Sequence, residues 1–241
     1  MSQEMALRPA SRSVTARERA RAELTREIRE EARRQLAQVG AAALSLRSVA
    51  RELGMVSSAL YRYYPSKEDL LTALIIDAYN AVGEVAEEAA GGGGSARERW
   101  MGACQAIRGW ARAHPHEYAL IYGSPVPGYR APEATVDPAS RVPLALVGLL
   151  RDARPRPADG PEISGALTGQ AAAVAALIAG TAGSAAGDTV RPEALVRGAL
   201  AWTQLFGLIS FELFGQYVGS FDPADELFHY ALVQMAQMVG L

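Results

Sequence analysis

The chain has 241 residues, which is enough for one or two domains with a sizeable core. Its apolar and charged fractions, 49% and 21%, are ordinary for a globular protein, and its net charge of -2 excludes a protein that binds nucleic acid through a surface basic throughout. The charge is uneven, because residues 1–75 hold 13 Lys and Arg against 9 Asp and Glu, whereas the remainder holds 11 against 17. We therefore expect a basic N-terminal part and an acidic body with different roles.

The chain has one cysteine, Cys104, so it cannot form an intramolecular disulfide, which fits a reducing compartment. No uninterrupted apolar run reaches the ~18–20 residues that a membrane-spanning helix needs. The arginines near the N-terminus precede no apolar core of the kind found in signal peptides. We therefore expect a cytoplasmic protein with no membrane partner.

The first predicted element is a long helix behind a polar arm. Residues 1–14 carry scattered arginines, and we expect them to form a flexible basic arm. Thr15 and Glu18 then form a capping-box pattern, which predicts a helix that runs to about Val39 and stops at Gly40. Alternating apolar and polar runs with β-branched residues are scarce throughout the chain, so the predicted fold class is all-α.

Two short helices are predicted next, over 46–53 and 57–64, joined by a turn that begins with Gly54. Ser45 precedes the first helix as its N-cap, and Pro65 ends the second because the residue before a proline disfavours the α region. This is the spacing of a helix-turn-helix unit. Its apolar side chains are expected to share one small core: Leu46, Val49, Ala50, Leu53, Val56, Leu60 and Tyr64.

Longer helices follow, and they define a second domain over residues 67–241, after a helix-turn-helix domain over 15–66. Ser66 is the expected N-cap of the next helix, and Ser95 with Glu98 forms another capping box behind the glycine-rich loop 91–95. The further helices are predicted over 67–90, 96–113, part of 114–122, 138–153, 162–182, 192–217 and 224–239, with a loop rich in proline and glycine at 123–140.

Polar and aromatic side chains remain on the second short helix once its core residues are set aside. Short hydroxyls at a helix N-terminus let a phosphate approach, arginine can pair with guanine or bind phosphate, and tyrosine offers both a hydroxyl and a ring. The candidates are Ser57, Ser58, Ala59, Tyr61, Arg62 and Tyr63, and the only lysine, Lys67, lies just beyond them. A plain helical hairpin with half-buried tyrosines would explain the same residues.

The run from Gly40 to Leu70 resembles the DNA-binding domain of the TetR family of bacterial transcriptional regulators. The matching residues keep their order and spacing without a gap: Ser45-Leu46-Arg47-x-Val49-Ala50, Leu53-Gly54-x-Val56-Ser57, Leu60-Tyr61 and Tyr64-Pro65-Ser66-Lys67-Glu68-x-Leu70. With the flanking helices, the resemblance covers about residues 15–85. The family usually has histidine followed by phenylalanine, or a similar pair, where this chain has Tyr63 and Tyr64, which leaves the contact made by Tyr63 open.

The resemblance implies a homodimeric repressor that binds a palindromic operator in double-stranded DNA, associates with the nucleoid, and is released by a small-molecule effector. It implies phosphate contacts from Ser45, Arg47, Tyr61, Tyr63 and Lys67. It implies base contacts from Ser58, Ala59 and Arg62, with Ser57 on the same face. The basic arm, residues 1–14, either contacts DNA, as in some members of the family, or is a solvated tail.

The second domain is expected to hold the effector pocket and the dimer interface. Its run Ala201 to Gln216 resembles the Trp-x-x-x-x-Gly element of one group of the family, with Phe206 where that group often has histidine. The last two predicted helices have apolar residues on more than one face, which favours a four-helix dimer interface over a single internal core. The candidate pocket residues are Tyr79, Trp100, Met101, Cys104, Ile107, Trp110, Tyr118, Tyr122 and Phe206. The same residues would also suit a plain core.

Enzymatic and metal-binding functions are not predicted, and no cofactor is expected. His114 and His116 lack a third ligand at a known spacing, and the remaining histidine is His229. Cys104 has no histidine near it in sequence, and the chain has no Gly-x-Ser-x-Gly elbow. The alternative to a DNA-binding regulator is an all-helical protein-interaction or signalling module, and salt-dependent binding to duplex DNA distinguishes the two.

Overall fold

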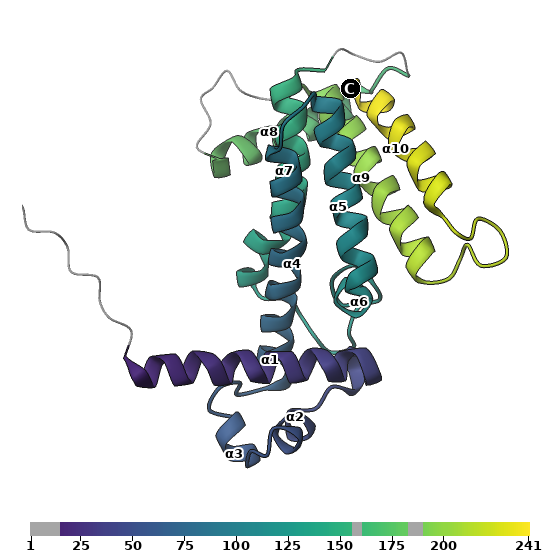
Figure 1. The fold of residues 1–241 in the computed structure, drawn as a ribbon. Helices are drawn as coiled ribbons and strands as arrows, with labels where there is room; N and C mark the ends of the chain where they lie inside the picture. The colour runs from purple at the N-terminus through teal and green to yellow at the C-terminus, as the bar shows by residue number, and fades with distance from the viewer. Residues whose placement is uncertain (1–14, 156–160, 183–189) are drawn as a thin grey trace, which may run out of the picture. The chain divides into compact units, whose positions relative to one another are not determined.

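The computed structural model describes residues 15–155, 161–182 and 190–241 (Figure 1). Within these residues the chain forms ten α-helices and one short 3₁₀ helix, with no β-strand, so the predicted all-α class is confirmed. The arm predicted over residues 1–14 lies outside the described residues.

The chain divides into two compact units, Met1–Leu70 and Leu71–Leu241. The helices of the first unit are α1 (Ala16–Ala43), α2 (Leu46–Glu52) and α3 (Ser57–Leu60). The helix α4 (Lys67–Gly91) begins in the first unit and continues into the second, so one unbroken helix carries the chain between them.

The helix α1 begins with the capping box that the sequence predicts. The Glu18 amide donates to Thr15 Oγ1 at 3.2 Å, and the Thr15 amide donates to Glu18 Oε2 at 2.8 Å. This pair satisfies amides that have no partner within the first turn. The predicted stop at Gly40 is a break rather than an end, because Gly40 has φ 72° and ψ 169° and the chain then winds on to Ala43.

The helix α3 is shorter than the predicted range 57–64. After Leu60 the amides of Arg62 and Tyr63 donate to carbonyls three residues back, on Ala59 at 3.3 Å and on Leu60 at 2.8 Å. Such bonds tighten the last turn of a helix. Tyr64 and Pro65 then lead the chain away into α4, as expected from the restriction that a proline places on the residue before it.

The small core of the first unit contains most of the residues predicted for it. Leu46, Val49, Ala50, Leu60 and Tyr64 are buried, and α1 adds Ile28, Ala32 and Leu36. The prediction for Val56 was wrong, because its side chain is 69% exposed. Val56 is the N-cap residue of α3, and its extended backbone (φ -70°, ψ 137°) does not follow the helical period that places Leu60 inside.

The second unit is a helical bundle that follows the residue ranges predicted for it closely (Figure 1). Besides α4 it contains α5 (Ala96–Ala113), α6 (Pro115–Tyr122), the 3₁₀ helix η1 (Glu133–Thr135), α7 (Val136–Ala153), α8 (Gly165–Ala182), α9 (Pro192–Leu213) and α10 (Asp225–Val239). The predicted capping box at Ser95 and Glu98 starts α5. The predicted range 192–217 was too long, because α9 ends at Leu213 and Gly215 has φ 77°.

The core of the second unit is centred on α5 and α9. The helix α9 packs against α5, α7, α8 and α10, and α5 packs against α7 and α10 as well. The largest fully buried side chains there include Trp100, Ile107, Tyr118, Leu205 and Ile209. Their burial places the two helices at the centre of the bundle, so changes on either helix reach most of the unit.

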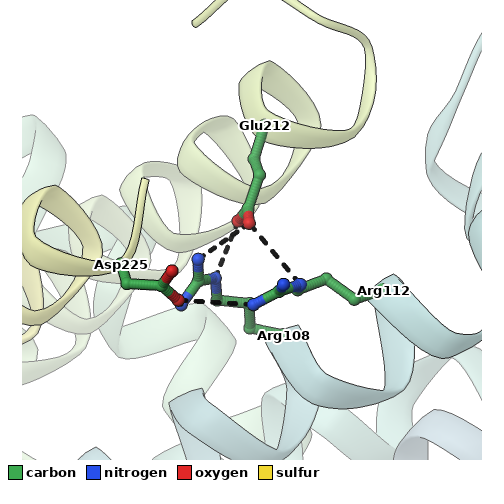
Figure 2. A network of polar contacts seen from close by, with 4 residues as sticks. All are labelled: Arg108, Arg112, Glu212 and Asp225. Atoms are coloured by element: carbon green, nitrogen blue, oxygen red, sulfur yellow. Dashed lines mark hydrogen bonds and ion pairs between the residues drawn. The ribbon is translucent and has the colours of Figure 1, made fainter. Parts of the chain in front are cut away.

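An ionic cluster ties α5 to the junction between α9 and α10 (Figure 2). Arg108 donates two hydrogen bonds of 2.7 Å to the carboxylate of Glu212 and lies 2.9 Å from Asp225. Arg112 contacts the same two carboxylates, at 3.7 Å and 3.3 Å. The hydrogen bond to Glu212 is the largest cause that raises the pKa of Arg108, against the lowering effect of its burial.

The helix α9 is long and apolar enough, by composition alone, to cross a membrane. Its most apolar 18-residue window has a mean hydropathy of 1.3, and 28% of that window is buried. Its packing against α5, α6, α7, α8 and α10 identifies it instead as a bundle helix with an uncovered apolar side. A helix that is apolar all round is stable in water only when another surface covers it.

Candidate DNA-binding surface and effector cavity

The turn between α2 and α3 orients α3 so that one side of it faces outward. Gly54 has φ 65°, a conformation that favours glycine, and the Met55 amide donates to the Ala50 carbonyl at 2.8 Å. Leu60 anchors α3 in the core and is fully buried. The opposite side of α3 is therefore left to the solvent.

The side chains predicted to contact DNA differ in their exposure to solvent. Arg47, Ser58, Tyr61 and Arg62 are exposed, and Tyr61 shows 41% of its surface. The half-buried members of the predicted set are Ser45, Ser57, Ala59, Tyr63 and Lys67. Ser58, Tyr61 and Arg62 follow one another at helical spacing, so they form one outward surface, which we call the α3 face.

Two exposed arginines in the first unit have no acidic partner in the part of the chain that the structure describes. Neither Arg47 nor Arg62 makes a side-chain hydrogen bond or ion pair with a described residue. Arg51, between them in sequence, contacts Ser48 and Glu52 instead. An exposed guanidinium without a carboxylate is available to an external phosphate or guanine.

Tyr63, at the position where the family often has histidine, packs against α1. The guanidinium of Arg21 lies over the Tyr63 ring, 5.0 Å from its centroid. The neighbouring Tyr64 is held from α1 as well, because Arg29 Nε donates to its hydroxyl at 2.8 Å. Both tyrosines thus contact α1. Tyr63 does so through its ring and Tyr64 through its hydroxyl, and the Tyr64 side chain is buried.

Lys67 has a partner within the first unit that the sequence analysis missed. Its Nζ atom donates to the Ala42 carbonyl at 2.6 Å. A cation at the start of α4 is unfavourable for the helix dipole, and the carbonyl near the end of α1 offsets that cost. A phosphate is therefore not needed to explain the lysine, and its predicted contact with DNA stays a prediction.

Ser45 occupies the N-cap position of α2, but its hydroxyl makes no capping hydrogen bond. The amides at the start of α2 therefore lack a side-chain acceptor from this residue. Nearby, Ser66 Oγ accepts from the Asp69 amide at 3.1 Å, so the predicted cap of α4 is made. The difference leaves the Ser45 hydroxyl available for an external acceptor or donor.

The residues predicted to line a pocket separate into a buried group and an aromatic cluster. Trp100, Cys104, Ile107, Trp110 and Tyr118 are buried in the core of the second unit, and Met101 packs beside them. The aromatic cluster joins Tyr79, Tyr118, Tyr122 and Phe206, with the Tyr122 and Phe206 centroids 4.2 Å apart.

The hydroxyls of Tyr79 and Tyr118 in this aromatic cluster are satisfied within the protein. The Tyr118 hydroxyl donates to the Phe206 carbonyl at 3.1 Å, and the Tyr79 hydroxyl donates to the Ile121 carbonyl at 3.3 Å. Burial, the largest cause, raises the pKa of Tyr118 and of Tyr122. Neutral, internally bonded tyrosines are typical of a structural cluster as much as of a binding site.

A cavity of about 510 Å³ opens elsewhere in the second unit, between α5, α7, α8 and α9. Trp100 lines it, and none of the other predicted pocket residues does. Its walls come from residues such as Leu146, Leu150, Ala171, Val174 and Leu195. The sequence did carry one signal for this cavity. The helix α8 has no charged residue, and the sequence analysis assigned it no function.

Comparison with known proteins identifies the class to which these two units belong. Residues 28–74 match a family model described as bacterial regulatory proteins of the tetR family. Residues 100–235 match a second model, described as the C-terminal domain of tetracyclin repressor-like proteins. The chain therefore belongs to the TetR family of bacterial regulators.

Individual relatives agree with the family models. The HTH-type transcriptional regulator Rv1816 of Mycobacterium tuberculosis (strain ATCC 25618 / H37Rv) is 38% identical over 216 residues, which cover 85% of this chain and 86% of the relative. The crystal structure of the regulatory protein SCO4313 is similar with a TM-score of 0.71 and 35% identity, over 92% of this chain and 98% of that one. A TetR family transcription regulator from Marinobacter aquaeolei VT8, 18% identical, has the same fold, with a TM-score of 0.58 over 91% of this chain and 97% of that one.

These relationships confirm the predicted family and class of function. The protein is a transcriptional regulator with a helix-turn-helix DNA-binding domain, and its family and relatives are regulators rather than enzymes. A bacterial transcription regulator acts on the chromosome, so the predicted cytoplasmic location agrees with its family.

Proposed function

We propose that the protein is a repressor that binds a palindromic operator as a homodimer and leaves it when a small-molecule effector binds. The observation that carries this proposal is the α3 face, where Ser58, Tyr61 and Arg62 stand exposed, together with Arg47 on α2, which is exposed and has no partner among the described residues. A short helix with polar side chains at its outer surface fits the major groove of B-form DNA. Association with the nucleoid would follow from operator binding.

Each residue of the surface has a role in this proposal that its chemistry supports. Arg62, with Ser58 and Ala59, contacts base edges, because arginine is the side chain that most often reads guanine. Ser45, Arg47, Tyr61, Tyr63 and Lys67 contact phosphates, and Ser57 lies at the start of the same helix. Phosphate contacts set register and supply most of the affinity, whereas base contacts supply the sequence preference.

Val56 is an additional candidate that the sequence analysis assigned to the core. Its side chain is exposed at the start of α3, beside the proposed reading surface. An apolar side chain in the major groove can contact the methyl group of thymine. We include Val56 among the residues that contact bases.

A homodimer is supported by apolar side chains that the second unit leaves exposed. Phe211, Val218, Phe221 and Tyr230, from the end of α9, the following turn and α10, are all more than half exposed. Other apolar residues of these helices, such as Leu205, Ile209 and Leu232, are fully buried within the chain. Gly207 adds to the argument, because a Cβ there would meet no atom, so another helix can approach closely.

The palindrome and the dimer depend on each other. A two-fold symmetric pair of reading helices fits two half-sites about one helical turn apart, or a multiple of that distance. A single reading helix buries too little surface for high specificity, since specific protein–DNA interfaces bury about 1,000–2,500 Å² of protein surface. Release by an effector requires that the effector bind the free and DNA-bound forms with different affinity.

The test is selection of bound sequences from a random pool of duplex DNA, followed by titration of the winning site. We expect a symmetric consensus, bound as one dimer per site, with an affinity that falls steeply as salt is raised. A scrambled duplex of the same composition is the control. Recovery of no consensus, with no affinity for any duplex at low salt, would support the protein-interaction module instead.

A further inference from the structure

We propose that the cavity between α5, α7, α8 and α9 binds an uncharged, mainly apolar molecule with one hydrogen-bond acceptor, which the indole N–H of Trp100 recognises. The inference deepens the proposed effector release, and it rests on that function only for the consequence at DNA. The cavity lies wholly within the second unit, so binding itself is measurable without DNA.

The size of the cavity suits a small organic molecule. Its volume of about 510 Å³ falls within the range of about 300–1,000 Å³ typical of ligand pockets. Aliphatic side chains from three helices, among them Leu146, Leu150, Ala171 and Leu195, form buried parts of its wall. An apolar wall favours a ligand whose surface is mostly hydrocarbon.

The composition of the wall excludes charged ligands. Among the described residues that line the cavity, none is charged. An ammonium or carboxylate placed against aliphatic walls without a counter-charge loses much more hydration than it gains in contacts. The hydroxyl of Thr203, one of the few polar groups of the wall, already donates to the Ala199 carbonyl at 2.9 Å. Gln170 is exposed, so its amide keeps its contact with water.

Trp100 lines the cavity, and its indole carries an unpaired N–H group that is buried beside it. Its side chain is 1% exposed, and its Nε1 atom has no hydrogen-bond partner among the residues that the structure describes. Leaving a buried N–H unpaired is unfavourable, so nearly all such groups in native proteins have a partner. An acceptor on the ligand would satisfy it.

Two alternatives for that N–H are weaker. An isolated water would need two to four polar partners, and the aliphatic wall around Trp100 offers few. A hydrogen-bond acceptor for Nε1 from the protein itself is absent among the described residues. Because Nε1 is shielded from solvent, neighbouring side chains must shift for an acceptor to reach it. Binding is thereby coupled to a movement of the wall.

The experiment uses the full-length protein and three naphthalene probes of nearly equal shape. 2-Acetylnaphthalene carries a carbonyl acceptor, 2-isopropenylnaphthalene replaces that oxygen by a CH₂ group, and 2-naphthoate carries a charge. Calorimetric titration measures each affinity. We expect the ketone to bind about two- to tenfold more tightly than the alkene, the increment of one neutral hydrogen bond, and the naphthoate to bind at least tenfold more weakly than either.

Two variants assign the binding to this cavity. Trp100→Phe keeps an aromatic ring but removes the N–H, so the ketone and alkene should bind with equal affinity. Ala171→Phe fills the cavity from α8 and leaves Trp100 unchanged in sequence, so both probes should lose affinity at least tenfold. Should Trp100→Phe fail to fold, the preference of the wild-type protein for neutral over charged probes and the effect of Ala171→Phe still test the proposal.

The possible outcomes separate this inference from the proposed function. Tightest binding of the naphthoate, a ketone preference that survives Trp100→Phe, or undiminished binding to Ala171→Phe would overturn the ligand class or its site. If the neutral probes bind as expected but no operator is selected, the cavity proposal stands and the repressor proposal fails. Operator binding with no affinity for any probe would refute the cavity and leave the DNA-binding proposal standing.

Discussion

The guanidinium of Arg21 lies over the ring of Tyr63, 5.0 Å from its centroid, and so joins α1 to the turn after α3. Exposed cation–π pairs contribute about 0.5–1 kcal/mol. We expect Arg21→Met to lower the free energy of unfolding by about that amount, and to have almost no effect in a Tyr63→Leu background. Urea unfolding of the four proteins of this double-mutant cycle measures the coupling, and purely additive effects would contradict the pair.

Replacing Tyr61 or Tyr64 by alanine is predicted to change different properties: DNA affinity for Tyr61 and domain stability for Tyr64. Tyr61 is exposed on the α3 face, so Tyr61→Ala should weaken operator binding by about 1–3 kcal/mol and leave the melting temperature unchanged. Tyr64 is buried and bonded to Arg29, so Tyr64→Ala should destabilise the domain by about 3–5 kcal/mol. Unfolding of Tyr61→Ala would instead assign Tyr61 to the core.

Arg62 is predicted to read bases. Arg62→Ala should relax the sequence preference at one position of each half-site, at a cost of about 1–3 kcal/mol against the best sequence and less against others. Competition binding with single-base variants of the operator measures this. Arg26→Ala, which removes the same charge from a site paired with Glu23 and Glu30, is the control. An equal loss on every sequence would assign Arg62 to phosphate.

Phe211 is predicted to lie in the dimer interface. Its side chain is 53% exposed on α9, so Phe211→Arg should leave the monomer folded, shift sedimentation towards the monomer and lower operator affinity together with it. Val136→Arg places the same charge on another exposed apolar site, at the start of α7, and should do neither. A Phe211→Arg protein that sediments as wild type would exclude this face from the interface.

The thiol of Cys104 is predicted to be unreactive in the folded protein. It should also make the free energy of unfolding fall as the pH becomes alkaline. Burial raises the pKa of its thiol to about 12, above the ordinary value of 9.0. Below the ordinary value both states are protonated. Between that value and 12 only the unfolded state ionises, so the folded state loses stability as pH rises. By pH 10 we expect wild type to lose about 1–2 kcal/mol relative to Cys104→Ala, and a difference that does not change with pH would contradict this.

The first unit was largely predictable because its determinants are local. Gly54, Pro65 and the apolar residues between Leu46 and Tyr64 lie within a few turns of one another, so their spacing indicated a helix-turn-helix unit. Val56 was misassigned because a residue just outside a helix does not obey the helical period. The partner of Lys67 was missed because the Ala42 carbonyl lies 25 residues away and leaves no signature in side-chain pattern.

The cavity was not predictable, because four helices far apart in sequence enclose it. Periodicity identified the apolar residues of α5 and α9 but not which of them face a space rather than another side chain. The aromatic residues expected to line a pocket pack on one another instead, as the 4.2 Å separation of the Tyr122 and Phe206 rings shows. Trp100 alone satisfied both the expectation and the geometry.

The ratio of affinities for the selected palindrome and for a scrambled duplex, measured at the same salt, tests the central claim most directly. A TetR-type regulator that reads bases through the α3 face should prefer the palindrome by at least about 10³-fold at physiological salt. The preference should fall in Arg62→Ala and remain in Arg26→Ala. A ratio near one at every salt concentration would contradict sequence-specific DNA binding by this protein.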